Sequence, residues 1–151
     1  MVHTFHGVDD VLASVGTQLG HTDWLEITQE QVNTFADATG DHQWIHVDVE
    51  RAAKGPFGGT IAHGYLTLSL IARFGPELFK IEGVSASLNY GVNKVRFPAP
   101  VPVGAKIRAS ATVSGAQQIG SGIQVSFQWV IEIENNPKPA CVAETVVLLV
   151  P

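Results

Sequence analysis

The feature that most constrains the fold is a strict alternation of apolar and polar residues in the second half of the chain. The clearest run has an apolar side chain at every second position: Ile123, Val125, Phe127, Trp129, Ile131 and Ile133. Successive side chains of a strand point to opposite faces, so this run predicts a strand with one buried face. Residues 84–97, 106–113 and 140–149 show the same alternation, and turns rich in Gly and Pro separate the segments. Four long antiparallel strands follow, with a bulge expected near residues 91–93 in the first, where the alternation changes parity.

A long apolar helix is predicted directly before these strands. Residues 62–74 are apolar on almost every side, which is typical of a helix enclosed by other elements. Before it, we predict helices over residues 8–15 and 28–40, one helical turn over residues 49–53, and a short strand over residues 23–27. Thr28 and Gln31 form a helix-starting pattern and Gly40 a helix-ending one. The prediction is an α+β fold in which a five-stranded antiparallel sheet wraps around a long, central, buried helix.

Composition limits the class of protein. The chain has 151 residues, the size of one ordinary domain, with 45% hydrophobic and 15% charged residues, as in a well-packed globular protein. Its net charge is −5 and its nine Lys and Arg residues are dispersed, which argues against nucleic-acid binding. No signal-peptide pattern and no run of roughly 18 apolar residues is visible, so we expect a cytoplasmic protein without a membrane span. The single cysteine, Cys141, is predicted to be a buried structural thiol.

A carboxylate and an imidazole lie five residues apart in the segment Gly40-Asp41-His42-Gln43-Trp44-Ile45-His46. An Asp and a His that hold one water between them can take and return its proton, which is general acid–base catalysis. Such a spacing also arises from an Asp that forms a turn and a His that is merely half-buried. The pair lies, however, in a long irregular segment that leads into the apolar helix, where functional loops are common. Asp41 and His46 are therefore our candidate catalytic pair.

The segment Ile61-Ala62-His63-Gly64-Tyr65 leads directly into the apolar helix. The start of a helix offers free backbone N–H groups and the positive end of a dipole, which suit an oxygen that gains negative charge. Gly64 could supply such an N–H group without a side chain that blocks the approach, a contribution of about 10² to 10³ in rate. The alternative is that Gly64 permits close packing while His63 caps or fills the turn.

Two further interpretations concern cations. His42 and His46 are four residues apart, and Asp41 or His63 could join them around a metal ion. This segment follows Gly40, which ends the helix, so helical geometry across that spacing is not assured, and we predict no metal site. Separately, basic residues that could hold the phosphates of an anionic ligand alternate with apolar ones or follow the candidate pair: Lys94, Arg96, Arg51 and Lys54. For them a solvent-exposed strand or helix face is the simpler explanation.

Taken together, four segments of this chain resemble the MaoC-like (R)-specific enoyl-CoA hydratases, the hydratase 2 family of the hot-dog fold. The segments are Phe35-Ala36-Asp37-Ala38-Thr39-Gly40, the Asp41-x4-His46 core, Ile61-Ala62-His63-Gly64-Tyr65, and Lys94-Val95-Arg96-Phe97-Pro98-Ala99-Pro100-Val101. Their joint order and spacing is far more specific than any one segment. The sequence Asp-His-Gln-Trp-Ile-His is most similar to the short members often described as nodulation protein N-like.

The resemblance implies one hot-dog domain over residues 1–151, a homodimer, and reversible hydration of trans-2-enoyl-CoA to (R)-3-hydroxyacyl-CoA. CoA is then part of the substrate, and no separate cofactor is implied. Asp41 and His46 match the catalytic pair of the family, and Gly64 matches its oxyanion donor, with Gln43 and His63 in support. Many members have Asn at the position of Gln43, so the side-chain amide must be placed differently here.

Two other functions stay open from the sequence. A hot-dog thioesterase also binds an acyl-CoA and polarises its carbonyl, but water attacks C1 instead of C3. A non-catalytic acyl-binding subunit of a hetero-oligomeric dehydratase would not need both Asp41 and His46. Neither the acyl chain length nor the choice between CoA and an acyl-carrier protein follows from the residues alone.

Overall fold

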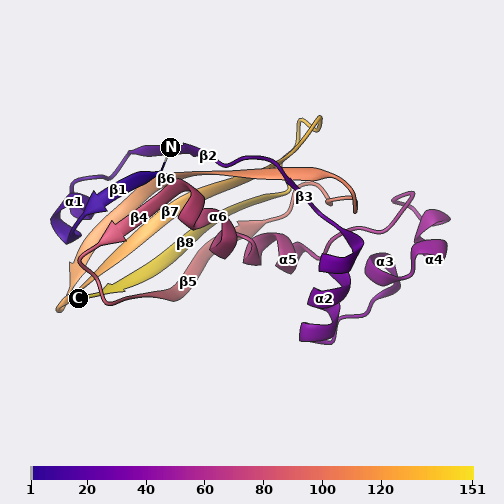
Figure 1. The fold of residues 1–151 in the computed structure, drawn as a ribbon, viewed down its shortest axis with the longest axis horizontal. Helices are drawn as coiled ribbons and strands as arrows, with labels where there is room; N and C mark the ends of the chain where they lie inside the picture. The colour runs from indigo at the N-terminus through magenta and orange to yellow at the C-terminus, as the bar shows by residue number, and fades with distance from the viewer. Residues whose placement is uncertain (1) are drawn as a thin grey trace.

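The computed structural model describes residues 2–151 and has the hot-dog architecture that the resemblance implied, a curved antiparallel sheet with one central helix (Figure 1). The long strands are β5 (Ala86–Arg96), β6 (Lys106–Ile119), β7 (Gly122–Ile133) and β8 (Cys141–Val150). They lie in the order β2-β6-β7-β8-β5, and all pairs are antiparallel. The strand predicted over residues 23–27 is present only as the short strand β3 (Leu25–Glu26). A further strand that was not predicted, β2 (Gln18–His21), precedes it, and both pair with β6.

Helices occupy all the positions that the sequence predicted, but the central helix is divided in two, and a further short helix over residues 44–47 lies in the segment that was predicted to be irregular. They are α1 (Val8–Leu12), α2 (Gln29–Thr39), α3 (Trp44–Val47), α4 (Val49–Ala53), α5 (Gly64–Ser69) and α6 (Ile71–Leu78). The central helix is thus α5 followed by α6, and the residue between them, Leu70, keeps right-handed helical backbone angles. Figure 1 shows α2, α3 and α4 together at one end of the molecule, beyond the start of α5, and both chain termini at the other end.

A second, small sheet was not predicted. Strand β1 (His3–His6) pairs in parallel with β4 (Phe79–Glu82), which directly follows α6. Four-residue strands contain too few alternations to be recognised from a pattern of period two. Phe5 of β1 is nevertheless fully buried and part of the core, and its ring lies edge-on to Phe79, with the ring centres 6.2 Å apart.

The core lies between the inner face of the sheet and the central helix. In β7 every second side chain is buried, from Ile123 to Ile133, as the alternation predicted. Phe74 and Leu78 of α6 are buried against this face, and one cluster of buried residues joins them to β6, β7 and β8. This packing fixes the position of the central helix and therefore of its first residue, Gly64.

Strand β5 differs from the other long strands because it is the edge of the sheet and almost all of it is exposed. The bulge predicted near residues 91–93 is confirmed: the pairing of β5 with β8 shifts between Asn89 and Gly91 and again between Val92 and Lys94. Large apolar side chains of this edge are exposed, among them Leu88 and Tyr90, which are 50% and 68% exposed. An exposed apolar strand edge is able to pair with another strand.

Helix α2 starts and ends as its sequence predicted. The Thr28 hydroxyl accepts a hydrogen bond from the backbone N–H of Gln31, at 3.2 Å. At the other end, Gly40 has a left-handed backbone with φ of 79°, and its N–H donates to the carbonyl of Ala36. This turn directs the chain out of the helix, so Asp41 follows at a defined position.

Cys141 is a free thiol, fully buried at the start of β8, as expected. Among residues 2–151 no helix is long and apolar enough to cross a bilayer.

Replacing Gly40 by Ala should destabilise the protein, since Ala in the left-handed region costs about 1 kcal/mol or more. A Cβ at Gly40 would meet no atom within 4 Å, so the loss would come from the backbone alone. Gly59→Ala is the matched control, because that site is equally open and has no positive φ. Urea unfolding should show Gly40→Ala as clearly less stable than Gly59→Ala; equal stability would contradict this account of the turn.

The buried thiol predicts a pH dependence. Burial raises the pKa of Cys141 to about 11 from the ordinary value of 9.0, so the unfolded chain loses this proton at lower pH than the folded chain. Between these two values, rising pH therefore lowers the contribution of Cys141 to stability. The difference in unfolding free energy between wild type and Cys141→Ala should shrink as the pH rises from 8.5 to 11. A difference independent of pH would contradict the raised pKa.

Candidate active site

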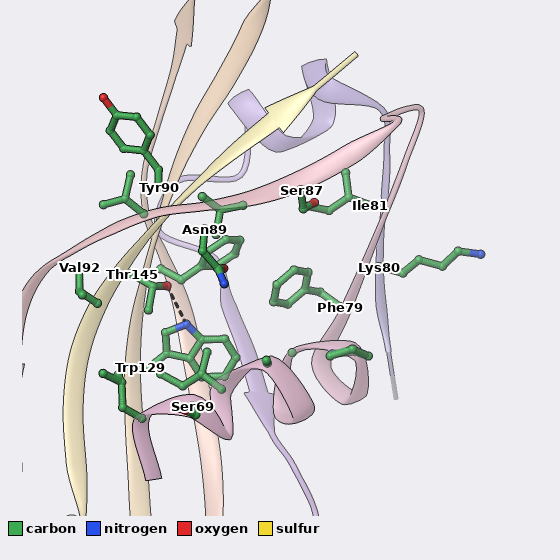
Figure 2. A pocket seen from close by; sticks show the side chains of 18 of the residues that line it. Ser69, Phe79, Lys80, Ile81, Ser87, Asn89, Tyr90, Val92, Trp129 and Thr145 are labelled. Atoms are coloured by element: carbon green, nitrogen blue, oxygen red, sulfur yellow. Dashed lines mark hydrogen bonds between the residues drawn. The ribbon is translucent and has the colours of Figure 1, made fainter. Parts of the chain in front are cut away.

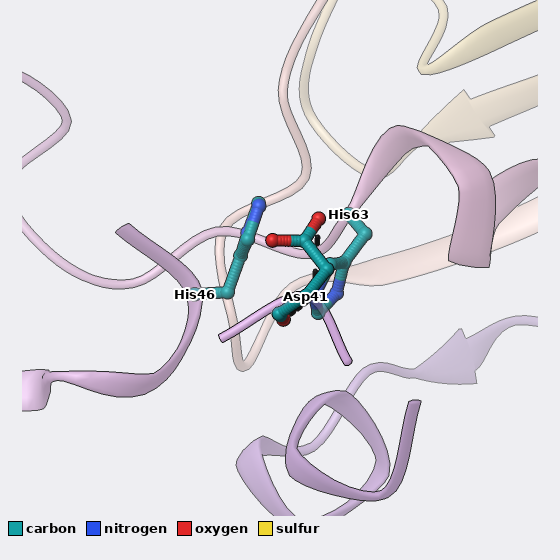
Figure 3. A group of neighbouring side chains, drawn as sticks. All are labelled: Asp41, His46 and His63. Atoms are coloured by element: carbon teal, nitrogen blue, oxygen red, sulfur yellow. Dashed lines mark hydrogen bonds and ion pairs between the residues drawn. The ribbon is translucent and has the colours of Figure 1, made fainter. Parts of the chain in front are cut away.

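The structure brings together Asp41, His46 and His63, which come from three different segments. Asp41 follows the end of α2, His46 lies in α3, and His63 directly precedes α5. One carboxylate oxygen of Asp41 and one ring nitrogen of each histidine all lie within 4.8 Å of one another (Figure 3). A carboxylate and two imidazoles this close form a group that can bind and move a proton.

His46 is held in one tautomer. Its Nδ1 lies 2.7 Å from the backbone carbonyl oxygen of Ile61, in a buried contact. Because a carbonyl oxygen can only accept, Nδ1 must carry the hydrogen. The other nitrogen, Nε2, then has a free lone pair in the neutral ring. His46 is only 6% exposed, so this base is held in a nearly dry position.

The carboxylate of Asp41 lies at the boundary between the protein and solvent. Its side chain is 51% exposed, and Oδ1 accepts a hydrogen bond from the backbone N–H of Gln43 at 3.3 Å. A water oxygen within about 2.8 Å of two acceptors can bridge a gap of up to about 5.6 Å. Among the described residues Asp41 and His46 form no ion pair within 4.0 Å, yet a carboxylate oxygen and a ring nitrogen lie within 4.8 Å, a separation that one shared water can bridge.

His63 connects the two members of this pair. Its Nε2 donates to the backbone carbonyl of Asp41 at 3.0 Å and lies 3.9 Å from Oδ2 of the same residue. Its ring stacks on that of His46, with centres 3.8 Å apart, and Phe35 packs nearby at 4.9 Å. Nδ1 of His63 is buried without a hydrogen-bond partner among the described residues. The sequence identified His63 as a neighbour of Gly64 but carried no signal for this contact with Asp41.

Gly64 is the first residue of α5, where a backbone N–H has no partner within the helix. A Cβ at this position would lie 3.2 Å from the ring of Phe97, closer than nearly all real Cβ contacts. Phe97 belongs to the Lys94–Val101 segment, so that part of the predicted pattern packs on the helix start. Gly64 therefore permits close packing at the helix start, and its N–H group has no partner within the helix. The side chain of His63 makes no capping hydrogen bond.

The two polar neighbours of Asp41 have different roles. Gln43 lies before α3, and its side chain is exposed and makes no capping hydrogen bond. It supports the site through its backbone, which donates to Asp41 and accepts from the N–H of His46 at 3.0 Å. His42 instead hydrogen-bonds to Asp37 at 2.9 Å, and this contact raises the pKa of His42. His42 therefore belongs to a surface pair outside the acid–base group.

The geometry of the two buried histidines does not suit one shared metal ion. A metal must lie near the plane of each imidazole, along the nitrogen lone pair, and the lone pairs must converge. The rings of His46 and His63 are stacked 3.8 Å apart, with an angle of 23° between their planes, so their lone pairs lie in two separate, nearly parallel planes and do not converge on one point between the rings. We therefore treat Asp41, His46 and His63 as an acid–base group.

The four candidate phosphate-binding residues lie in two places. Arg51 and Lys54 belong to α4 and its end, and the Arg51 guanidinium stacks over Trp44 at 4.3 Å from the ring centre. Lys94 and Arg96 are exposed at the end of β5, and Arg96 donates to the carbonyl of Val95.

An apolar cavity lies beside the central helix (Figure 2). It has a volume of about 980 Å³ and lies between α5 and α6 on one side and β5 and β8 on the other. It reaches α5 at Leu68 and Ser69, four and five residues after Gly64, and Asp41, His46 and His63 do not line it. Its far end is formed by Phe79 and Phe127, whose rings stack at 4.8 Å. Sequence reasoning placed apolar residues in this helix but did not show that they line a cavity.

Known proteins are similar to this chain over most of its length. The MaoC like domain family matches residues 10–134. The 3-hydroxyacyl-thioester dehydratase Z of Mycobacterium tuberculosis is 54% identical over 147 residues, which cover 97% of each protein. Nodulation protein N of Rhizobium leguminosarum is 42% identical over 93% of this chain and 89% of its own.

Among solved structures, the (R)-hydratase from A. caviae involved in PHA biosynthesis superposes with a TM-score of 0.73. It is 25% identical and covers 91% of this chain and 96% of its own. The residues matched by the family model, 10–134, include Asp41, His46 and Gly64. With the family model and two relatives spanning nearly all of the chain, this protein belongs to the MaoC-like dehydratases.

Proposed function

We propose that this protein is a 3-hydroxyacyl-thioester dehydratase, a hydro-lyase that reversibly hydrates trans-2-enoyl-CoA to (R)-3-hydroxyacyl-CoA. One observation carries the proposal: the Asp41 carboxylate and a ring nitrogen of His46 lie close enough to share one water. The similarity to the mycobacterial dehydratase over 97% of both chains supports the reaction class. The likeness to the (R)-hydratase supports the direction of attack on the substrate.

In hydration, Asp41 and His46 hold the water, and its oxygen attacks C3 of the enoyl chain. One member of the pair takes the proton of this water; Nε2 of His46 is available because Nδ1 donates to Ile61. The C2–C3 double bond opens toward the thioester, and the pair then returns one proton to C2. Water is consumed, no other reactant is needed, and dehydration follows the same steps in reverse. Positioned acid–base groups typically contribute about 10² to 10⁴ in rate.

As C3 is attacked, negative charge moves to the thioester oxygen. In the proposal the N–H of Gly64 donates to this oxygen, at the first position of α5. This N–H and the helix dipole act where charge develops, which is the arrangement expected of an oxyanion site. Phe97 packs against Gly64 and limits the space around it, so the ring helps to define where the thioester lies.

The acyl chain is assigned to the apolar cavity beside α5 and α6. An acyl chain whose thioester lies at Gly64 can extend along the central helix, which lines the cavity from Leu68 onward. Small residues of α6, Ala72 and Gly75, line it and leave room for methylene groups. Burial of each methylene stabilises binding by about 0.8 kcal/mol. The CoA phosphates remain assigned to Arg51, Lys54, Lys94 and Arg96 at the surface.

The hydratase explains the site better than the two alternatives. A thioesterase must direct water at C1, whereas here the shared water lies with an acid–base pair suited to proton exchange at adjacent carbons. A non-catalytic subunit would not require the tautomer of His46 to be fixed by a buried hydrogen bond. We infer that residues 1–151 act as one hot-dog unit in this reaction.

We also propose that the protein is a homodimer that pairs along β5. This strand is the open edge of the sheet, and its apolar side chains Leu88, Tyr90 and Val92 are 47–68% exposed. Tyr65 of the central helix is 71% exposed, and its ring is 6.3 Å from that of Phe97. A second copy would cover this apolar strip, which a lone chain leaves in water.

Asp41→Asn should reduce kcat by about 10² to 10⁴ with crotonyl-CoA, because an amide neither takes nor returns the proton. Asp37→Asn is the control: it makes the same change on a side chain that is 78% exposed and pairs with His42. Loss of enoyl-thioester absorbance measures both. A kcat of Asp41→Asn near that of wild type would overturn the assignment of the pair.

Leu88→Lys should convert the dimer to a monomer, since it places a charge in the proposed interface. Ile119→Lys provides the comparison, because Ile119 is similarly exposed, at 47%, but lies at the β6–β7 turn. Size-exclusion chromatography with light scattering should report a dimer for wild type and Ile119→Lys. A monomeric wild type at micromolar concentration, or a dimeric Leu88→Lys, would contradict this interface.

A further inference from the structure

We propose that Gln29 is a positioning residue for catalysis, which holds His46 in place through the backbone. The inference rests on the proposed function, in which His46 acts on the water. Gln29 is the first residue of α2, whereas His46 lies in α3 and Ile61 in the segment before α5. The carboxamide of Gln29 joins all three segments.

Every hydrogen-bonding atom of this carboxamide is used. Nε2 donates to the backbone carbonyl of His46 at 2.8 Å and to Oδ1 of Asn33 at 2.9 Å. Oε1 accepts from the Thr60 hydroxyl at 2.6 Å. The His46 carbonyl can only accept, so the orientation of the amide follows from the contact itself. A half-buried amide with both donors and its oxygen bound is fixed in position.

These contacts belong to a closed network of hydrogen bonds around His46. The imidazole donates to the carbonyl of Ile61, and the N–H of Ile61 donates to the carbonyl of Ile45 at 3.0 Å. Gln29 completes this network. It binds the backbone of His46 and also the hydroxyl of Thr60, which is the residue before Ile61. His46 is thus held at its side chain by one segment and at its backbone by another.

Helix capping does not explain these contacts. The Thr28 hydroxyl already caps α2 through the N–H of Gln31, and apart from Asn33 the groups that the Gln29 side chain binds lie outside α2. A carboxylate at position 29 would even favour the positive end of the helix dipole. Gln29→Glu keeps the shape of the side chain but removes both donated hydrogen bonds. If Gln29 served only to start the helix, this change would be tolerated; if it positions His46, the change should lower activity.

The first test compares Gln29→Glu with Gln31→Glu in steady-state kinetics with crotonyl-CoA. Both variants make the same charge change in the first turn of α2, and Glu at position 31 suits a helix start. Gln29→Glu should lower kcat by about 10- to 100-fold, as loss of a supporting hydrogen bond typically does. KM should change by no more than about twofold, since ground-state binding is untouched. Thermal unfolding of both variants is measured as well, and kcat is compared at a temperature at which both are fully folded, because Gln29→Glu also loses the stability of two hydrogen bonds.

Thr60→Val tests whether Thr60 and Gln29 act through the same hydrogen-bond network. It removes the hydroxyl that binds Oε1 of Gln29 but leaves the Gln29–His46 contact, so its loss of kcat should be smaller. In the double variant with Gln29→Glu, the loss in log kcat should be clearly smaller than the sum of the two single losses, because both changes act on the same hydrogen-bonded contact to His46. Fully additive losses would contradict a joint role.

A readout without turnover separates this inference from the function itself. Nitrogen and proton NMR of the imidazoles, assigned with His46→Ala, should show a slowly exchanging Nδ1–H of His46 in wild type. In Gln29→Glu this signal should broaden or exchange faster, while Gln31→Glu keeps it. If wild type is active and Gln29→Glu matches Gln31→Glu in kcat, only the positioning role is overturned. If wild type hydrates no enoyl thioester, the proposed function fails, and an unchanged His46 signal would overturn the positioning as well.

Discussion

The site depends on one hydrogen bond, between Nδ1 of His46 and the carbonyl oxygen of Ile61. This bond joins the segment after α2 to the segment before α5, so the acid–base pair and the start of the central helix are positioned together. It also fixes the imidazole tautomer and thereby leaves the lone pair of Nε2 free in the neutral ring. A buried bond of this kind contributes only about 1 kcal/mol to stability, yet it decides which of the two ring nitrogens can accept a proton.

The rest of the fold serves to keep those two segments adjacent. The packing of α6 against the alternating faces of β6 and β7 fixes the line of the central helix, and Gly64 is its first residue. Gly40 ends α2 in a left-handed turn, so Asp41 leaves the helix toward that same helix start. His63 then binds the Asp41 carbonyl and stacks on His46, so one buried ring touches both members of the pair.

Much of this could be predicted from the sequence because the signals are local. Alternation identified β7, the Thr28 and Gly40 patterns delimited α2, and the parity change located the bulge in β5. The network at the site could not be predicted, because its partners are distant in sequence and mostly backbone groups. Nothing in Gln29 or His63 reveals that one binds the His46 carbonyl and the other the Asp41 carbonyl. The cavity likewise arises from the spacing between α6 and β5, which no residue pattern records.

The position of the attacking oxygen in the product tests the central claim most directly. Wild-type protein would be mixed with crotonyl-CoA in water enriched in oxygen-18, and the products separated and analysed by mass spectrometry and chiral chromatography. The account predicts the heavy oxygen in the C3 hydroxyl of intact (R)-3-hydroxybutyryl-CoA. Heavy oxygen in the carboxylate of free crotonate would instead show a thioesterase, and no incorporation at all would contradict catalysis by Asp41 and His46.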